Sequence, residues 1–211
     1  MRQLLLDFTQ APAPTFANYV RGSNAEAVHS LEAAARGQCA ERVIYVWGES
    51  AAGKTHLLEA FAAAAGVPVR AGAYLNPAEV AGTLAVDGVE ALSEPAQAAL
   101  FNAFNDGSLR LLVASASSAP RDLALRRDLA TRLATGLTYR LIALSDTEKR
   151  AALGAHARSR GFDLADEVAS YLLTHARRDM GSLVAALDCL DRYSLETGRP
   201  ITVPLLKAAL A

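Results

Sequence analysis

The stretch Arg42 to His56, with the sequence RVIYVWGESAAGKTH, constrains the fold more than any other part of the chain. Val43 to Trp47 is a run of β-branched and aromatic residues, which predicts a short strand buried on both faces. The next eight residues, Gly48 to Thr55, fit the pattern G-x-x-x-x-G-K-[ST], and the helix-forming stretch HLLEAFAAAAG follows. A strand, a glycine-containing loop and a helix in this order are the context that a phosphate-binding loop requires.

The residue types of this loop suit a nucleoside polyphosphate. Two glycines let the backbone curl, so that successive N–H groups and the start of the next helix converge on the anion. The charge of Lys54 suits the β and γ phosphates, and the Thr55 hydroxyl is a hard oxygen ligand for Mg²⁺. We therefore predict that ADP or ATP binds here with Mg²⁺. The loop residues of this predicted site are Gly48, Glu49, Ser50, Ala51, Ala52, Gly53, Lys54, Thr55 and His56.

The alternative for this loop is a glycine-containing turn that matches the pattern by chance. The chain contains three lysines and eighteen arginines. A lysine at the one position where the motif demands it therefore argues for the phosphate-binding interpretation.

Composition narrows the class of protein. The chain has 211 residues, of which 52% are hydrophobic, enough for a globular core. Its formal net charge of −1 gives no general basic field, so we expect DNA contact to be indirect or weak. No run of eighteen apolar residues and no signal peptide is visible, which predicts a cytoplasmic protein without a membrane segment. Cys39 and Cys189 fit no metal or redox motif and are expected to be reduced thiols.

The order of predicted elements indicates an α/β fold. A helix is expected between Gly22 and Gly37, capped by Ser23 or Asn24. Beyond the P-loop helix, apolar strands alternate with helices, which implies a five-stranded parallel sheet with helices on both faces. The further strands are expected at 67–74, 83–87, 109–114 and 138–144, with helices at 93–105 and 121–135.

From Ser145 onward the pattern predicts helices only, beginning with a capping box that runs from Ser145 to Glu148. Further helices are expected at 164–177, at 180–196 and from 202 to the end. We therefore divide the chain into a peptide and linker at 1–14, a nucleotide-binding core at 15–144 and a small helical lid at 145–211.

Asp87 ends the apolar strand LAVD, about thirty-five residues after the P-loop. A carboxylate at this place would hold Mg²⁺ together with Thr55; the alternative is an aspartate that caps a helix or turn. The next residue is Gly88, where ATPases of this kind usually carry a second acid, and Glu90 lies two residues further on. We therefore predict weak or no autonomous ATP hydrolysis.

A P-loop core of five strands followed by a helical lid resembles an AAA+ module. The string TFANYVRGSN at 15–24 is similar to the segment that leads into the adenine pocket in the clade of the replication initiator DnaA. This resemblance implies adenine contacts from Tyr19 and Val20. It also places a sensor I residue at or near Ser115.

A second string, DLATRLATGLTYRL at 128–141, resembles the arginine-finger segment of the same clade. The resemblance implies that Arg132 acts on a nucleotide bound by a neighbouring subunit. The alternative is a surface arginine paired with Asp128 one helical turn earlier. Other arginines nearby, Arg121, Arg126 and Arg127, are expected to form a solvated face, with contact to DNA or a partner as the other possibility.

A third string, RRDMGSL at 177–183, lies where the sensor II helix of this clade begins. The clade carries an arginine where this chain has Gly181, so coupling of the lid to the phosphates would need Arg177 or Arg178. The departure adds to the expectation that hydrolysis by the isolated chain is slow.

Two features distinguish the chain from DnaA itself. No helix-turn-helix pattern follows the lid helices, and the N-terminus fits the sliding-clamp peptide Q-L-x-L-x-[FL] on a proline-containing tether. The predicted clamp-binding residues are Gln3, Leu4, Leu6 and Phe8. The alternative is an amphipathic first strand, which would show the same pattern of apolar and polar residues.

Together these features resemble the regulatory inactivators of DnaA, clamp-tethered homologues that stimulate hydrolysis of DnaA-bound ATP. The resemblance implies the DNA polymerase III β subunit and DnaA as partners, with a homodimer as a further possibility. The competing hypothesis is an autonomous AAA+ ATPase motor or loader of the helicase-loader or transposition-helper type. A DNA-binding initiator fragment is disfavoured by the near-neutral charge.

Overall fold

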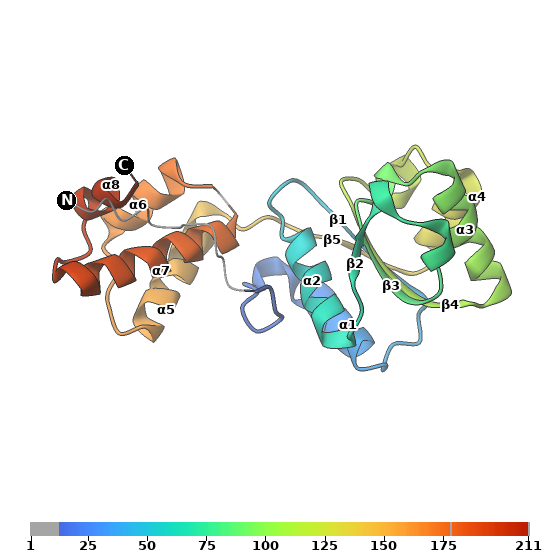
Figure 1. Cartoon of the computed structure of the whole chain (residues 1–211), viewed down its shortest axis with the longest axis horizontal. Helices are drawn as coiled ribbons and strands as arrows, with labels where there is room; N and C mark the ends of the chain where they lie inside the picture. Colours follow the sequence, from blue (N-terminus) through green and yellow to red (C-terminus); the bar gives the residue numbers. More distant parts are fainter. Residues whose placement is uncertain (1–12, 178, 211) are drawn as a thin grey trace. The chain divides into compact units, whose positions relative to one another are not determined.

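The structure is a computed structural model that describes residues 13–177 and 179–210, without the side chains of 208–210. Its backbone contacts separate two compact units: 14–143, and Ala13 together with the described residues from Leu144 onward. Figure 1 traces the chain through both units. The predicted clamp peptide, with Gln3, Leu4, Leu6 and Phe8, lies outside the described residues.

The first unit is built on a five-stranded parallel sheet with the order β2-β3-β4-β1-β5. Because all strands run the same way, their carboxyl ends share one edge of the sheet, where α/β proteins place their ligands. This sheet confirms the predicted α/β core. The strands are β1 (Val43–Trp47), β2 (Val69–Ala71), β3 (Gly82–Asp87), β4 (Leu109–Ala116) and β5 (Leu137–Arg140).

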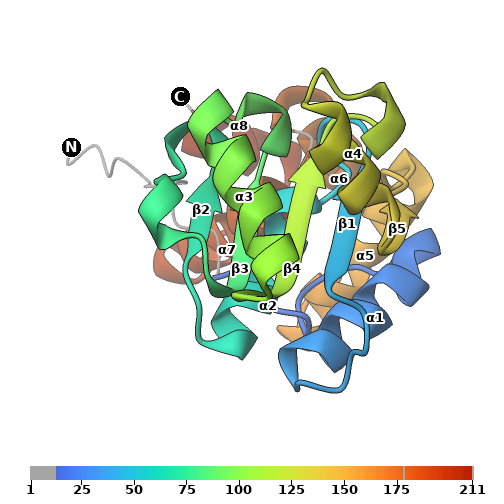
Figure 2. The same ribbon diagram turned by 90° about the vertical axis from the view of Figure 1, so that its right-hand side faces the viewer.

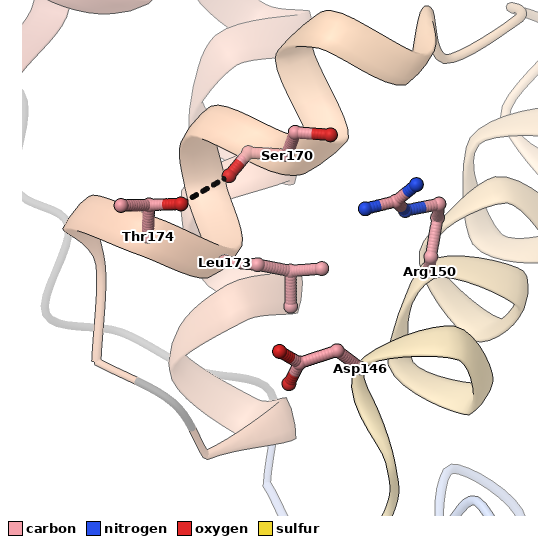
Figure 3. A pocket seen from close by; sticks show the side chains of 5 residues that line it. All are labelled: Asp146, Arg150, Ser170, Leu173 and Thr174. Atoms are coloured by element: carbon pink, nitrogen blue, oxygen red, sulfur yellow. Dashed lines mark hydrogen bonds between the residues drawn. The ribbon is translucent and has the colours of Figure 1, made fainter.

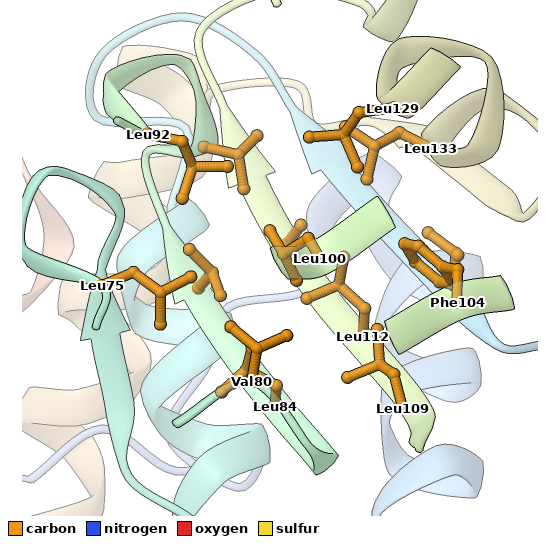
Figure 4. Packing of buried hydrophobic residues seen from close by; sticks show 14 of the residues in the cluster. Leu75, Val80, Leu84, Leu92, Leu100, Phe104, Leu109, Leu112, Leu129 and Leu133 are labelled. Atoms are coloured by element: carbon orange, nitrogen blue, oxygen red, sulfur yellow. The ribbon is translucent and has the colours of Figure 1, made fainter. Parts of the chain in front are cut away.

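Helices cover both faces of the sheet because its strands are apolar on both sides. Alternate residues of β1 belong to two separate buried clusters: Ile44 to the one that includes α1 and α2, Tyr45 to the one that includes α3 and α4. Figure 2 looks onto the face covered by α3 and α4, and Figure 4 shows the apolar side chains packed between these helices and the strands. The helices are α1 (Ala25–Ala35), α2 (Lys54–Ala65), α3 (Glu94–Asp106) and α4 (Arg127–Ala134).

Three predicted elements were clearly too long. The strand expected at 67–74 is limited to Val69–Ala71, because residues 72–74 form a 3₁₀ turn. The helix expected from residue 121 begins only at Arg127, because Pro120 starts a separate 3₁₀ turn, η5 (Pro120–Asp122), and the backbone N–H of Arg126 is bound by Gln97. The strand expected to reach residue 144 ends at Arg140, because the Asn24 side chain hydrogen-bonds both the backbone N–H and the backbone oxygen of Ile142. Further 3₁₀ turns are η1 (Gly22–Asn24), η2 (Gly72–Tyr74), η3 (Pro77–Glu79) and η4 (Val89–Ala91).

The second unit is helical in its described part, which confirms the predicted lid. Its helices are α5 (Asp146–Ser159), α6 (Asp166–His175), α7 (Met180–Thr197) and α8 (Val203–Leu210), packed around a leucine-rich cluster. The predicted capping box is present: the Ser145 hydroxyl accepts from the Glu148 N–H, and the Glu148 carboxylate accepts from the Ser145 N–H. Among the described residues, no helix is long and apolar enough to cross a membrane.

Candidate functional site

The P-loop joins the carboxyl end of β1 to the start of α2, and its two glycines leave no room for a side chain. Gly53, which caps α2, has a φ of +89°, and a Cβ there would lie 2.8 Å from Cε2 of Tyr19. A Cβ on Gly48 would lie 2.5 Å from the backbone oxygen of Leu141. The motif glycines are therefore required by packing around the loop as well as by its curvature.

Lys54 closes the loop on itself. Its Nζ donates hydrogen bonds to the backbone oxygens of Gly48 and Glu49, both at 2.8 Å. The loop turns sharply at Ala51, which adopts a φ of +62°, a strained conformation for a residue with a Cβ. The ammonium group therefore lies against the inside of a tightly curved backbone at the N-terminus of α2, as an anion site requires.

The two predicted magnesium ligands face each other. The Thr55 hydroxyl donates a hydrogen bond of 2.8 Å to Oδ2 of Asp87. Both are hard oxygen groups, and Mg²⁺ commonly takes one or two protein ligands and completes its shell with phosphates and water. The described residues include no group of three or more His, Cys, Asp or Glu that could hold a metal. A hydroxyl and a carboxylate at this distance fit Mg²⁺ brought in with a nucleotide.

Ser115 connects this pair to the neighbouring strand. Its side chain is fully buried at the end of β4, donates to Oδ1 of Asp87 and accepts from the backbone N–H of Gly88 at 3.1 Å. Since both oxygens of Asp87 accept hydrogen bonds from hydroxyls, the carboxylate is held in one orientation. The predicted sensor I position thus lies beside the predicted metal ligand.

The predicted adenine segment packs against the P-loop. The Tyr19 hydroxyl lies 3.4 Å from the backbone oxygen of Ala52, and its ring meets His56 edge to face with centroids 5.3 Å apart. His56 in turn contacts the backbone oxygen of Thr15 through Nε2 at 3.0 Å. Burial raises the pKa of Tyr19 above its ordinary value, while the hydrogen bond from Asn24 opposes that shift. Val20 is half-buried in the same segment.

One contact of this region was not predicted from the sequence. Ser23 or Asn24 was expected to cap a helix; Asn24 immediately precedes α1, but its buried side chain makes no capping hydrogen bond. It donates instead to Tyr19 Oη at 3.1 Å and to the Ile142 oxygen at 3.0 Å, and it accepts from the Ile142 N–H at 2.8 Å. The Ile142 side chain is 47% exposed next to this network. A contact across 118 residues leaves no local signal in the sequence.

The position after Asp87 is shaped for glycine. Gly88 has a φ of +71°, and a Cβ on Gly72 would lie 2.1 Å from the Gly88 oxygen, so η2 is pressed against this backbone. A Cβ on Gly88 would point toward Oε2 of Glu90, 4.0 Å away. Glu90 is itself engaged, since its Oε1 accepts from the backbone N–H of Ser117 at 2.9 Å.

Arg132 lies exposed in the last turn of α4. Its Nη2 donates a hydrogen bond of 3.0 Å to Oδ1 of Asn105, near the end of α3. Asp128, the alternative partner, accepts from Arg126 at 2.8 Å instead. The Arg126 guanidinium holds the pKa of Asp128 below its ordinary value. Arg132 is therefore not paired with Asp128 in the structure.

A shallow, open surface at the start of α4 is lined by Arg126, Arg127, Asp128 and Thr131. Arg121 nearby is strongly exposed and lies 3.8 Å from Asp122. The predicted arginine-rich face is thus present and only partly neutralised by neighbouring acids.

The lid has a smaller hollow of about 290 Å³ between α5 and α6, with Arg150 and Asp146 facing the α6 side chains in Figure 3. It includes none of the predicted site residues. Of the predicted sensor II substitutes, Arg177 is exposed and lies 3.9 Å from Asp179, and Arg178 is outside the described residues. Gly181 lies in the first turn of α7.

Solved structures share this fold. Domain III of the Thermotoga maritima replication initiation protein DnaA matches with a TM-score of 0.70 at 20% identity, over 94% of this chain and 96% of that one. A replication initiator DnaA bound to AMPPCP and single-stranded DNA matches with a TM-score of 0.68 at 19% identity, over 88% and 67%. The RuvB branch migration motor of Thermotoga maritima gives 0.67 at 16% identity, over 98% and 72%.

The fold is that of an AAA+ core with a helical lid, as in domain III of DnaA. Residues 146–210 match the family described as "Hda, lid domain". An uncharacterised protein of Haemophilus influenzae is 32% identical over 228 aligned positions, which cover 99% of this chain and 98% of that protein. The chain belongs to the same family as this Haemophilus protein.

Proposed function

We propose that the chain is a nucleotide-bound AAA+ regulator of replication initiation that docks on the DNA sliding clamp and stimulates hydrolysis of DnaA-bound ATP. The observation that carries the proposal is the placement of Arg132: exposed on α4 and held by Asn105 rather than by a neighbouring acid. A guanidinium in that state is available to the nucleotide of another subunit.

The resident nucleotide, ADP or ATP, would lie at the P-loop. Lys54 and the loop amides would hold its phosphates, Thr55 and Asp87 would hold Mg²⁺, and the segment with Tyr19 and Val20 would flank the adenine. The bound metal would supply charge neutralisation at the phosphates. The residues of this chain would bind and orient the nucleotide. Ser115 fixes the Asp87 carboxylate, and Tyr19 packs against Gly53.

The chain lacks a complete set of residues for hydrolysing its own ATP, so we assign Arg132 to the ATP of a partner. Gly88 carries no carboxylate, its left-handed backbone disfavours most residues with a Cβ, and Glu90 is bonded to Ser117. A finger supplied to a partner increases phosphoryl-transfer rates by roughly 10³-fold to 10⁵-fold. The chain would thus do its chemistry on the ATP held by DnaA, whose domain III shares this fold.

Docking would use the N-terminal peptide. Gln3, Leu4, Leu6 and Phe8 match a short motif for the sliding clamp, and the prolines that follow suit a tether. We infer that the protein acts in the cytoplasm and contacts DNA only indirectly or weakly, through the clamp and DnaA. A homodimer would be compatible with the exposed α4 surface.

The test is a single-turnover assay of ATP bound to DnaA, with clamp loaded on DNA and the full chain in excess. The proposal expects stimulation that requires both the clamp and the chain. A version lacking residues 1–10 should lose clamp pull-down and most of the stimulation. Absence of stimulation by the full chain, together with rapid ATP turnover by the chain alone, would favour the motor or loader alternative.

A further inference from the structure

Two amide side chains of α3 hold the two ends of α4. Gln97, only 7% exposed, accepts a hydrogen bond of 2.9 Å from the backbone N–H of Arg126, the residue before α4. Asn105, two turns further along α3, accepts from Arg132 at 3.0 Å. Between these polar contacts the helices pack through apolar side chains, which Figure 4 labels as Leu100, Phe104, Leu129 and Leu133. α3 and α4 are therefore connected as one unit.

The start of this unit is fastened to the segment that follows Asp87. The Gln97 side chain also donates from Nε2 to the backbone oxygen of Leu92 at 2.9 Å. Glu90, three residues after Asp87, accepts from the Ser117 N–H at 2.9 Å. Ser117 and Arg126 are the two ends of the connection between β4 and α4. We call the Glu90–Ser117 and Gln97–Arg126 hydrogen bonds the bracket.

The same segment is anchored at its other end in the predicted metal site. Asp87 accepts from Thr55 and Ser115, and Ser115 accepts from the N–H of Gly88. Mg²⁺ held by Thr55 and Asp87 would use lone pairs of the two side chains that share this hydrogen bond, and its charge would change the surroundings of the Asp87 carboxylate. Glu90 follows Asp87 by three residues, and Gln97 binds the backbone oxygen of Leu92 in the same segment, so the chain offers a short route from Asp87 to the bracket.

We propose that Glu90 and Gln97 are positioning residues. A magnesium-bound nucleoside polyphosphate binds at Thr55 and Asp87, and the bracket transmits this binding to α4. The bracket thereby sets the position of Arg132. The inference deepens the proposed function and rests on it for the role of Arg132. It differs from a catalytic role for Glu90, because a bracket needs an acceptor for the Ser117 N–H and does not need the negative charge.

Three substitutions separate these roles. Glu90→Ala removes the acceptor, whereas Glu90→Gln keeps an amide oxygen for Ser117 and removes only the charge. Gln97→Met keeps the size of the side chain and removes both polar contacts. The matched control is Asp106→Ala: Asp106 Oδ1 also accepts a backbone N–H, from Ser108 at 2.8 Å, but it lies outside the β4–α4 connection.

Hydrogen–deuterium exchange of the full chain, with and without ADP and Mg²⁺, tests whether the bracket couples the metal site to α4. This measurement needs no partner protein. The wild type, Glu90→Gln and Asp106→Ala should slow exchange at residues 117–134 by at least about threefold on adding the nucleotide. Glu90→Ala and Gln97→Met should bind ADP within about twofold of wild type and lose that response. A response that survives in Glu90→Ala overturns the inference; because Glu90 is exposed, this variant is expected to fold even if Gln97→Met does not.

Single-turnover hydrolysis of the partner's ATP then tests the consequence. At saturating chain, Glu90→Ala should lower the maximal rate by at least about tenfold, with half-saturation unchanged, and Glu90→Gln should restore it. Equal losses in Glu90→Ala and Glu90→Gln would assign the effect to the charge and overturn the bracket. If the wild type gives no stimulation, the proposed function fails, while the exchange response still decides whether the bracket couples the metal site to α4.

Discussion

The hydroxyl of Thr55, in the first turn of α2, lies 2.8 Å from the carboxylate of Asp87, at the end of β3. The two residues are 32 positions apart, and the parallel sheet brings them together because α2 begins and β3 ends at the same edge. Ser115 at the end of β4 approaches the other carboxylate oxygen. One edge of the sheet therefore gathers the predicted metal ligands beside the loop that carries Lys54.

Replacing Lys54 by alanine should weaken ADP and ATP binding by at least about tenfold, or about 1.4 kcal/mol. The ammonium is the one positive side chain of the loop, and its two bonds to Gly48 and Glu49 also hold the loop curved. Titration calorimetry measures the affinity. Unchanged affinity in a variant with a normal unfolding midpoint would contradict the P-loop assignment.

Clamp binding should depend on the first eight residues. Gln3 offers an amide for hydrogen bonding, and Phe8 offers a ring for an apolar pocket, so each truncation to alanine should cost on the order of 2 kcal/mol. The affinity of the Gln3→Ala, Phe8→Ala double variant for clamp fixed to a surface is the measurement. Lys54→Ala is the control, because it leaves the peptide intact. Binding equal to wild type would remove the tether from the proposal.

The chain alone should be a poor ATPase. Gly88 supplies no carboxylate after Asp87, and Glu90 is bonded to the Ser117 backbone, so turnover should fall far below roughly 1 s⁻¹. Steady-state phosphate release measures it. Rapid turnover that disappears in Glu90→Gln would instead assign Glu90 to water activation and support the motor alternative.

The elements and P-loop were predictable because their signals are local. β1 is a continuous apolar run that ends at a glycine, and the capping box of α5 lies within four residues. What was missed depends on distant contacts. The start of α4 is set by Gln97, 29 residues away, and the end of β5 by Asn24, 118 residues away. Neither contact changes the local hydrophobic pattern, so no reading of that pattern could find it.

Lid stability should fall in acid through Glu148. The backbone N–H and hydroxyl of Ser145 hold the pKa of Glu148 below its ordinary value of 4.5. A group whose pKa is lowered on folding contributes stability that is present above its unfolded pKa and lost as the pH falls through its folded pKa. Thermal unfolding of wild type and Glu148→Gln should therefore differ most near neutral pH and converge as the pH falls below the ordinary pKa of 4.5. A difference that does not vary with pH would contradict this prediction.

The decisive residue is Arg132. In the structure its partner is Asn105 on α3, and Asp128, four residues earlier, is bonded to Arg126. An exposed arginine used only for a surface contact contributes at most about 1 kcal/mol to stability, whereas a finger supplied in trans contributes roughly 10³-fold or more to a partner's rate. Arg132→Ala should therefore fold, bind nucleotide and bind the clamp normally, yet fail to stimulate hydrolysis of DnaA-bound ATP.

The matched control for Arg132→Ala is Arg127→Ala, which removes another exposed arginine from the same helix and equalises the change in net charge. If stimulation depended only on the positive charge of the α4 surface, both variants would lose it to a similar extent. The finger hypothesis instead expects a loss confined to Arg132, with Arg132→Lys failing to restore the rate because an ammonium lacks the planar fork of donors. Stimulation by Arg132→Ala within about threefold of wild type would remove Arg132 from the mechanism and leave the chain as a tethered binding module.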